Sequence, residues 1–263
     1  PVVMYSFGNF IVDVVYRQYL KIILADEFLG VKRKQGDNQS IIVSREWIER
    51  ALSTLRGCGV AFSTSFGGMA TATSTLASAL GIDRVVLVAP RGDDELGGVG
   101  AQYLTVMGVD TSLMPVLIEQ GSAVNLVRNL ESVGEGVFTK DYALYIDPLK
   151  GFPYRDSAAL EQIRQGDIVH LGGVESVFQF DHQNQTGIEQ AIEGMVTLVR
   201  HTKDRGAIVV ADFGEVDAGF WEMVPDNFFA DIDVVKPSLA LLQAIYASRN
   251  KDSLELNSAR LRI

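Results

Sequence analysis

The sequence has very little cysteine, since Cys58 is the only one among 263 residues. An internal disulfide is therefore excluded, and a single thiol fits a reducing compartment. We expect Cys58 to be a small buried residue at the start of a strand rather than a catalytic thiol.

Positive charge is also scarce, because the net charge is −10 and the only basic run is VKRK at residues 31–34. We expect this run to lie in a solvated loop, and we expect neither nucleic acid nor an anionic membrane as a partner. No apolar run reaches the length of a membrane span, and the N-terminus lacks the basic-then-apolar layout of a secretion signal. These features predict a cytoplasmic protein, or an organellar one if a leader was removed.

Several catalytic motifs are missing as well. The chain has no Walker Gly-x-x-x-x-Gly-Lys, no Gly-x-Ser-x-Gly elbow and no complete Gly-x-Gly-x-x-Gly after its first strand. The GGVG run at residues 97–100 is interpreted as the start of a helix. His170 is predicted to be a core histidine satisfied by neighbouring backbone. Neither His182 nor His201 has partners at metal-ligand spacing, so we predict no metal site.

From residue 60 onward the chain alternates strands and helices, which predicts a mostly parallel sheet covered on both faces. A helix over 45–56 is predicted from the N-cap Ser44, the apolar residues on one of its faces and Gly57 as its C-cap. A longer helix is predicted at 187–203. Continuous apolar segments of the buried parallel type predict strands at 84–89, 168–171, 208–212 and 232–236.

Residues 112–139 show a different pattern, because polar and apolar residues alternate in SAVNLVRNL and again in EGVFTK. The two segments are joined by VGEG, and together they predict a β-hairpin. Asn125 falls on one face of this hairpin, where it either contacts a ligand or is a solvated strand residue.

The most informative segment covers residues 66–98. A glycine pair, Gly67–Gly68, precedes a helix of small residues, which leads into the strand at 84–89. Glycines let a ligand approach the backbone, and the helix N-terminus behind them carries unpaired N–H groups and a partial positive charge. This pattern predicts a ligand-binding βαβ segment. The acids after the strand, Asp93 and Asp94, are expected to cap the next helix.

Six short motifs follow one another along residues 2–246: GNFIVD (8–13), the diglycine, APRGDDELG (89–97) followed by GVDTS (108–112), IVHLGGV (168–174), VVADFG (209–214) and DVVKPS (233–238). Their order and spacing resemble those of the ribokinase-like, or PfkB, family of sugar and nucleoside kinases. The resemblance implies an α/β fold with three α/β/α layers, a mostly parallel sheet and a small β-lid, in which the C-terminal part of the fold is missing. We expect a single domain over residues 1–263, with lid strands inserted at about 12–40 and 112–140.

The resemblance also implies a substrate site. In the family the acidic end of the first strand binds substrate hydroxyls, which points to Asp13, and the diglycine lies at the sugar site, which points to Gly67 and Gly68. Asn125 would lie under the lid. Asp13 can equally be a strand-end carboxylate that faces water, and the turn requires the two glycines in any case.

The chain departs from the family where catalysis takes place. The C-terminal Gly-Ala-Gly-Asp segment, which cradles the phosphate and supplies the base in the family, is absent, so no catalytic residue is named. The asparagine four residues after the diglycine is replaced by Ala72, and the Lys-Pro-Asn-x-x-Glu motif is replaced by a segment with Ser238 and Leu241. Leucine cannot order the water shell of a magnesium ion.

Two functions follow from these observations. In the first, the chain is a catalytically degenerate kinase-like protein that binds a small polyol or nucleoside, or is a subunit of a homo-oligomer or larger assembly. In the second, it is an active carbohydrate or nucleoside kinase that uses ATP and magnesium, and its catalytic segment lies in a longer natural product. No cofactor is assigned in the first case. The internal changes at Ala72, Ser238 and Leu241 favour the first function.

Overall fold

The structure, a computed structural model, describes residues 1–18, 39–131, 138–149, 157–173, 185–213, 222–225 and 227–236. The VKRK run, the VGEG turn, His182, Ser238 and Leu241 lie outside these ranges. No helix in the described part of the chain is long and apolar enough to cross a membrane.

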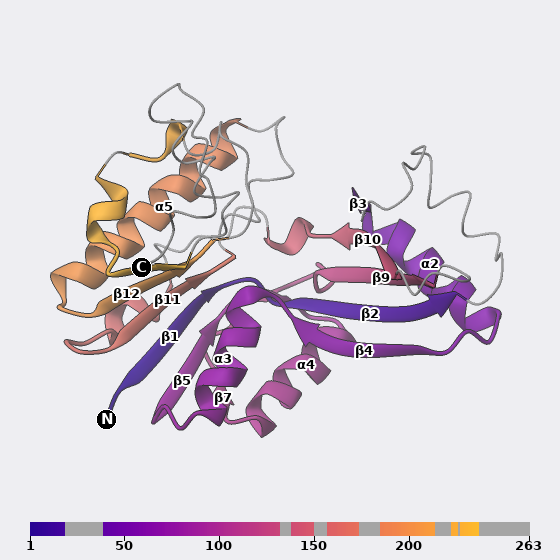
Figure 1. Ribbon diagram of the computed structural model, residues 1–263, viewed down its shortest axis with the longest axis horizontal. Coiled ribbons are helices and arrows are strands. Elements are labelled where there is room, and N and C mark those ends of the chain that lie inside the picture. The colour runs from indigo at the N-terminus through magenta and orange to yellow at the C-terminus, as the bar shows by residue number, and fades with distance from the viewer. Residues whose placement is uncertain are drawn as a thin grey trace, which may run out of the picture.

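The larger sheet has six strands in the order β13-β12-β11-β1-β5-β7, and all of its neighbouring pairs are parallel (Figure 1). Its strands are β1 (Val3–Gly8), β5 (Arg84–Val88), β7 (Val109–Asp110), β11 (Ile168–Gly172), β12 (Ile208–Asp212) and β13 (Val234–Lys236). The four strands predicted from apolar segments are therefore confirmed. The last begins at Val234 rather than at residue 232, because Ile232 is the C-cap of the short 3-10 helix η5 (Phe228–Asp231) and its backbone N–H donates to the Phe229 carbonyl oxygen.

Side chains of this sheet point alternately into two hydrophobic clusters, one on each face. Tyr5 and Phe7 of β1 lie in the cluster that contains α5 (Gln185–Asp204), whereas Met4 lies in the cluster that contains α3 (Met69–Ala79). The two helices accordingly lie on opposite sides of the sheet in Figure 1. The predicted α/β fold, with a mostly parallel sheet between helical layers, is confirmed.

A second sheet of five strands has the order β3-β10-β9-β2-β4 and extends to one side of the first (Figure 1). Its strands are β2 (Ile11–Gln18), β3 (Gln39–Ile42), β4 (Phe62–Gly67), β9 (Val124–Glu131) and β10 (Phe138–Tyr145). β9 and β10 are antiparallel, which confirms the strands of the predicted hairpin. The sequence gives no indication that β4 belongs here, yet it pairs antiparallel with β2. Two short strands, β6 (Arg91–Gly92) and β8 (Val116–Leu117), form a separate parallel pair.

Two predicted helix starts are confirmed by their caps. The Ser44 hydroxyl accepts a hydrogen bond from the Trp47 backbone N–H at 3.3 Å at the start of α2 (Arg45–Gly57). Asp94 Oδ1 accepts one from the Gly97 N–H at 2.9 Å at the start of α4 (Glu95–Val106). Asp93 does not cap this helix, because its carboxylate accepts from the backbone N–H of Glu119 at 3.1 Å.

Cys58 is exposed, so the prediction of a buried thiol at a strand start is wrong. The cysteine is instead the C-cap residue of α2, and its backbone N–H donates to the carbonyl oxygen of Thr54 at 2.9 Å. A residue that ends a surface helix in this way does not enter the core.

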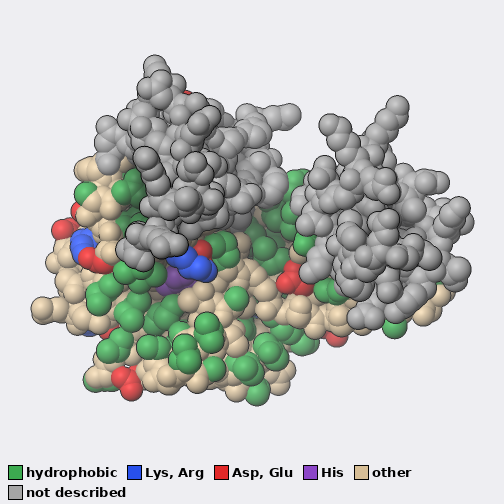
Figure 2. Space-filling model, viewed as in Figure 1, with side chains coloured by type: hydrophobic (Ala, Val, Ile, Leu, Met, Phe, Trp, Pro, Cys, Tyr) green, Lys and Arg blue, Asp and Glu red, His purple; other side chains and the backbone are tan. Residues whose placement is uncertain are grey.

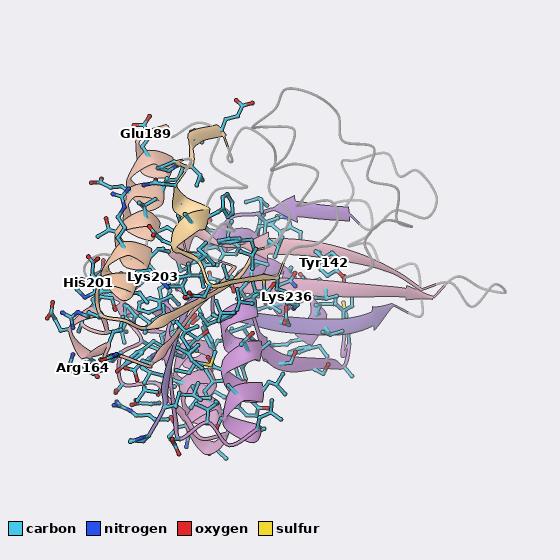
Figure 3. All side chains as sticks on the ribbon, turned by 60° about the vertical axis from the view of Figure 1, so that its left-hand side comes forward. Tyr142, Arg164, Glu189, His201, Lys203 and Lys236 are labelled. Carbon is cyan, nitrogen blue, oxygen red and sulfur yellow. The ribbon has the colours of Figure 1, made fainter. Side chains whose placement is uncertain are left out.

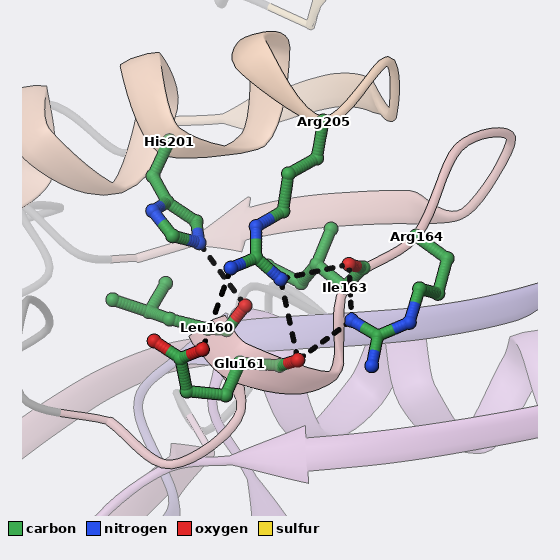
Figure 4. A network of polar contacts seen from close by, with 6 residues as sticks. All are labelled: Leu160, Glu161, Ile163, Arg164, His201 and Arg205. Atoms are coloured by element: carbon green, nitrogen blue, oxygen red, sulfur yellow. Dashed lines mark hydrogen bonds and ion pairs between the residues drawn. The ribbon is translucent and has the colours of Figure 1, made fainter.

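The C-terminal end of α5 is tied to the segment before β11, which contains the 3-10 helix η3 (Leu160–Gln162). His201 Nε2 lies 3.1 Å from the Leu160 carbonyl oxygen, and Arg205 donates to the carbonyl oxygens of Glu161 and Ile163, each at 3.2 Å (Figure 4). These contacts explain His201 as a structural residue. Figure 3 shows His201 and Lys203 together on α5, apart from Lys236 on β13.

Candidate functional site

The site begins where β1 and β11 end. Gly8 and Gly172 face each other in the last paired position of these parallel strands. A Cβ atom at residue 8 would overlap the Gly172 carbonyl oxygen and lie 2.9 Å from Cβ of Ala70, and one at residue 172 would lie 2.8 Å from the Ala70 nitrogen. The first turn of α3 is therefore packed directly on the strand backbone. This is the carboxyl edge of the sheet, where ligands bind in open α/β folds.

Asn9 lies between this edge and the diglycine. Gly68 is the N-cap of α3 with a φ of +95°, and a Cβ atom there would lie 2.5 Å from the Asn9 carbonyl oxygen. Gly173, on the other side, would place a Cβ atom 2.7 Å from the Asn9 amide nitrogen. Thr71 Oγ1 donates to the Asn9 carbonyl oxygen at 3.1 Å. The packing around Asn9 thus requires Gly68, whether or not the site binds a ligand.

Asp13, Gly67 and Asn125 come together on one face of the five-stranded sheet. In the strand register Asp13 of β2 lies opposite Asn125 of β9 on one side and opposite Ser65 of β4 on the other. Asn125 Nδ2 donates a hydrogen bond to Asp13 Oδ1 at 2.8 Å. A Cβ atom at residue 67 would overlap Asp13 Oδ2, so Gly67 leaves the space that the carboxylate occupies. Asp13, Gly67 and Asn125, three of the four predicted site residues, are therefore neighbours in space. The fourth, Gly68, follows Gly67 in the sequence.

Two oxygen acceptors of this row are unused within the described residues. Asn125 Oδ1 is buried and has no hydrogen-bond partner there, and Asp13 accepts only the bond to its Oδ1. Burial raises the pKa of Asp13, and the hydrogen bond from Asn125 opposes this increase. The row therefore combines a partly desolvated carboxylate with an unfilled amide oxygen, and both require hydrogen-bond donors.

A second polar cluster lies at the same sheet edge, against the first turn of α3. Ser6 Oγ lies 2.8 Å from Nδ1 of the buried His170 and donates to the Ala70 carbonyl oxygen at 3.2 Å. Burial lowers the pKa of His170 from 6.5 to about 4. Lys236 Nζ and Asp212 Oδ2 form an ion pair of 3.0 Å at the ends of β13 and β12. The prediction of a buried histidine is confirmed, but its partner is a serine hydroxyl rather than neighbouring backbone.

The sequence interpretation missed Asn9, Ser65 and the Ser6–His170 pair. Ser65 lies in the segment FSTSFG, whose alternation is a signal for a strand with one polar face. Asn9 directly follows the first strand, and strand ends are frequent positions for ligand contacts. No local pattern indicates the Ser6–His170 contact, because the two residues are 164 positions apart.

A parallel α/β sheet with a second, smaller sheet beside its carboxyl edge is the ribokinase-like fold of sugar and nucleoside kinases, and the predicted resemblance is confirmed at the level of the fold. The chain is similar to adenosine kinase from Sinorhizobium meliloti, with a TM-score of 0.64 and 16% identity over 95% of this chain and 68% of that one. It is also similar to a probable sugar kinase from Rhizobium etli (TM-score 0.60, 14% identity, 95% and 68%). A third similar structure is fructokinase with bound ATP from Xylella fastidiosa (TM-score 0.55, 19% identity, 89% and 60%).

No family model matches the chain, and no curated protein has a significantly similar sequence. The chain spans between 60% and 68% of the length of the three structural relatives. Proteins with one fold can have unrelated activities, so at this level of identity the likeness establishes the fold alone. The function has to be inferred from the residues of the site.

Proposed function

We propose that this chain binds a small hydroxylated molecule, a polyol or a nucleoside, at the row formed by Asp13, Asn125 and the diglycine Gly67–Gly68. The observation that carries the proposal is the pair of unused acceptors, Asp13 Oδ2 and the buried Asn125 Oδ1. An unpaired buried acceptor costs roughly 1–3 kcal/mol, and a ligand hydroxyl that donates to it removes this cost while giving up its own hydrogen bond to water. Two adjacent hydroxyl groups can donate to two adjacent acceptors.

The charges of the row favour a neutral donor over an anion. Asp13 is an acceptor when ionised, and it would repel the carboxylate or phosphate of an anionic ligand. The glycine pair adds no side chain to the site, and the space that a side chain would need at Gly67 is taken by the Asp13 carboxylate. Adenosine and fructose, after which two of the similar kinases are named, both carry adjacent hydroxyl groups.

We further propose that binding occurs without phosphoryl transfer. Ala72 is exposed on the first turn of α3, four residues after Gly68, at the position where the family has an asparagine. The described residues contain no group of three or more acidic, histidine or cysteine side chains that could hold a metal ion. Leu241, at the position of the family's glutamate, has no oxygen in its side chain either. The residues at these positions do not supply the side-chain oxygen ligands that magnesium requires.

The Asp13→Asn variant is expected to lose binding while it keeps or gains stability. A hydrogen bond to a charged acceptor contributes about 1.5–3 kcal/mol, so the dissociation constant should rise at least roughly tenfold. The raised pKa of Asp13 means that the ionised carboxylate is unfavourable in the folded protein, so the thermal midpoint of the unliganded variant at pH 7 should equal or exceed that of the wild type. Calorimetric titration with adenosine, fructose and ribitol, together with thermal unfolding, measures both effects.

Asp93→Asn is the matched control, because it removes the same charge from an exposed residue outside the row. It should bind the same compound with the affinity of the wild type. Wild-type protein that binds none of the three compounds, or an Asp13→Asn variant that binds as tightly as the wild type, would contradict the proposal.

The second candidate is an active kinase, and the ion pair of Lys236 and Asp212 at the carboxyl ends of β13 and β12 favours it, because charged residues at that edge can contact a bound nucleotide. This candidate predicts formation of ADP from ATP and magnesium when adenosine or fructose is present. We expect no turnover above the rate without acceptor. Acceptor-dependent turnover that is lost in Asp13→Asn would overturn the proposal of binding without phosphoryl transfer and support the kinase.

A further inference from the structure

The outer faces of α3 and α4 carry large apolar side chains that are exposed to solvent. Val106 is 80% exposed and Leu80 is 76% exposed. Together with their exposed neighbours they form what we call the α3–α4 patch, which consists of Leu76, Leu80, Val99, Tyr103, Val106 and Met107. Figure 2 shows hydrophobic side chains gathered on the part of the surface where these helices lie. Exposed apolar side chains that cluster in this way mark interaction sites.

The two halves of the patch are joined at the C-terminal ends of the helices. Ser78 Oγ donates a hydrogen bond to the Met107 carbonyl oxygen at 2.9 Å. A Cβ atom at Gly108 would lie 2.6 Å from the same hydroxyl oxygen, so only a glycine permits this approach. This contact brings the C-terminal ends of α3 and α4 together, and Leu80 and Val106 lie within two residues of it in the sequence.

The patch carries no charge. Residues 67–82 and 96–109 contain no Asp, Glu, Lys or Arg, although charged residues make up 21% of the chain. Charges occur instead at its border, where Arg84 and Asp110 form an ion pair of 2.6 Å next to Asp83. An uncharged apolar centre with a polar border is the composition of a protein–protein interface.

We infer that the α3–α4 patch is the contact through which two copies of this chain form a symmetric dimer. The chain has a net charge of −10, so two copies repel each other over most of their surfaces. An uncharged patch is a surface on which identical acidic chains can meet without burying like charges. A two-fold contact also requires a patch that is complementary to itself, which an uncharged apolar surface satisfies.

Other occupants fit the patch less well. Nucleic acid and anionic lipid need basic side chains, and the patch has none. A protein partner that binds through its charged side chains would find no ion-pair partner on this surface. Leu80 and Val106 lie at the C-terminal ends of α3 and α4, whereas the Asp13 row lies beside the N-terminal end of α3 at Gly68. A dimer centred on Leu80 and Val106 therefore lies away from the row, whereas Tyr103 of the patch contacts Phe66, next to Gly67, at 5.3 Å between ring centroids.

Sedimentation velocity over a dilution series of the 263-residue chain tests the inference, with reductant present because Cys58 is exposed and could link two copies. The wild type is expected at about twice the chain mass of 28.7 kDa. Val106→Glu and Val106→Lys should both raise the dissociation constant at least roughly tenfold, because either charge would be buried twice in a symmetric contact. Circular dichroism confirms that each variant is folded.

The pair of opposite charges separates burial from net charge. If the variants acted only by repulsion, Val106→Lys would strengthen the dimer of an acidic chain, and Val106→Glu alone would weaken it. Ile118→Glu and Ile118→Lys are the matched controls, because Ile118 is 68% exposed but lies outside the two helices. They should leave the dimer unchanged. A wild type that stays monomeric at all concentrations, or a dimer that tolerates both charges at residue 106, would overturn the inference.

Discussion

Replacing Gly8 with alanine is expected to destabilise the protein by at least about 3 kcal/mol and to leave little folded material. Gly8 has a φ of +154°, and its Cβ atom would overlap the Gly172 carbonyl oxygen, which belongs to the neighbouring strand. Backbone in a parallel sheet cannot move aside without breaking its ladder. The same Cβ atom would also lie 2.9 Å from the Cβ atom of Ala70, so α3 could no longer pack directly on the sheet edge.

Gly98→Ala is the matched control for this prediction, because a Cβ atom at residue 98 meets nothing within 4 Å. Gly98 lies inside α4, where alanine is a better helix former than glycine, so this variant should be more stable by about 0.5–1 kcal/mol. Urea unfolding followed by circular dichroism measures both changes. A Gly8→Ala variant that unfolds within about 1 kcal/mol of the wild type would show that the sheet edge adapts, contrary to the packing described.

Much of the larger sheet could be predicted because its elements carry local signals. Strands that are buried on both faces are continuous apolar segments, as in β5 and β12. Helix starts are marked by side chains that bond the backbone three residues later, as Ser44 and Asp94 do. Neither signal depends on which segments pair in space, so both can be recognised along the chain.

The second sheet was harder to predict because its pairing joins distant segments. β4 follows α2 and precedes α3, which is the order of a parallel βα unit, yet it pairs antiparallel with β2. Alternation places Asn125 on one face of a strand, but only the register of β2 and β9 brings it beside Asp13, 112 positions away. The position of Cys58 was predicted wrongly for a related reason. The residues around it do not indicate whether it ends the helix or begins the next strand.

Acid is expected to destabilise the protein through His170. Burial lowers the pKa of this histidine to about 4, whereas an unfolded chain leaves it near 6.5. The folded state therefore binds the proton less readily than the unfolded state. The stabilising contribution is complete above pH 6.5 and is lost as the pH falls toward 4, by up to roughly 3 kcal/mol at about 1.4 kcal/mol per pKa unit.

Two charges near His170 modify this effect. Burial is the largest cause of the lowered pKa of His170. Asp212 raises this pKa and Lys236 lowers it, and the two residues also form an ion pair with each other. Asp13 acts in the opposite direction, because its raised pKa makes the folded state bind a proton more readily as the pH falls. A comparison between two proteins that both retain Asp13 removes this contribution from the difference.

The change to measure is therefore His170→Asn, which keeps a polar atom within reach of Ser6 Oγ but has no group that titrates. Its free energy of unfolding in urea should be lower than that of the wild type at pH 7, because asparagine fills less of the site. Between pH 7 and pH 5 the wild type should lose about 2 kcal/mol more than the variant, since only the wild type binds the additional proton on unfolding. His201→Asn, which removes the histidine that contacts Leu160 on α5, should retain the loss seen in the wild type. Equal losses in the wild type and in His170→Asn would show that another group controls the response to acid.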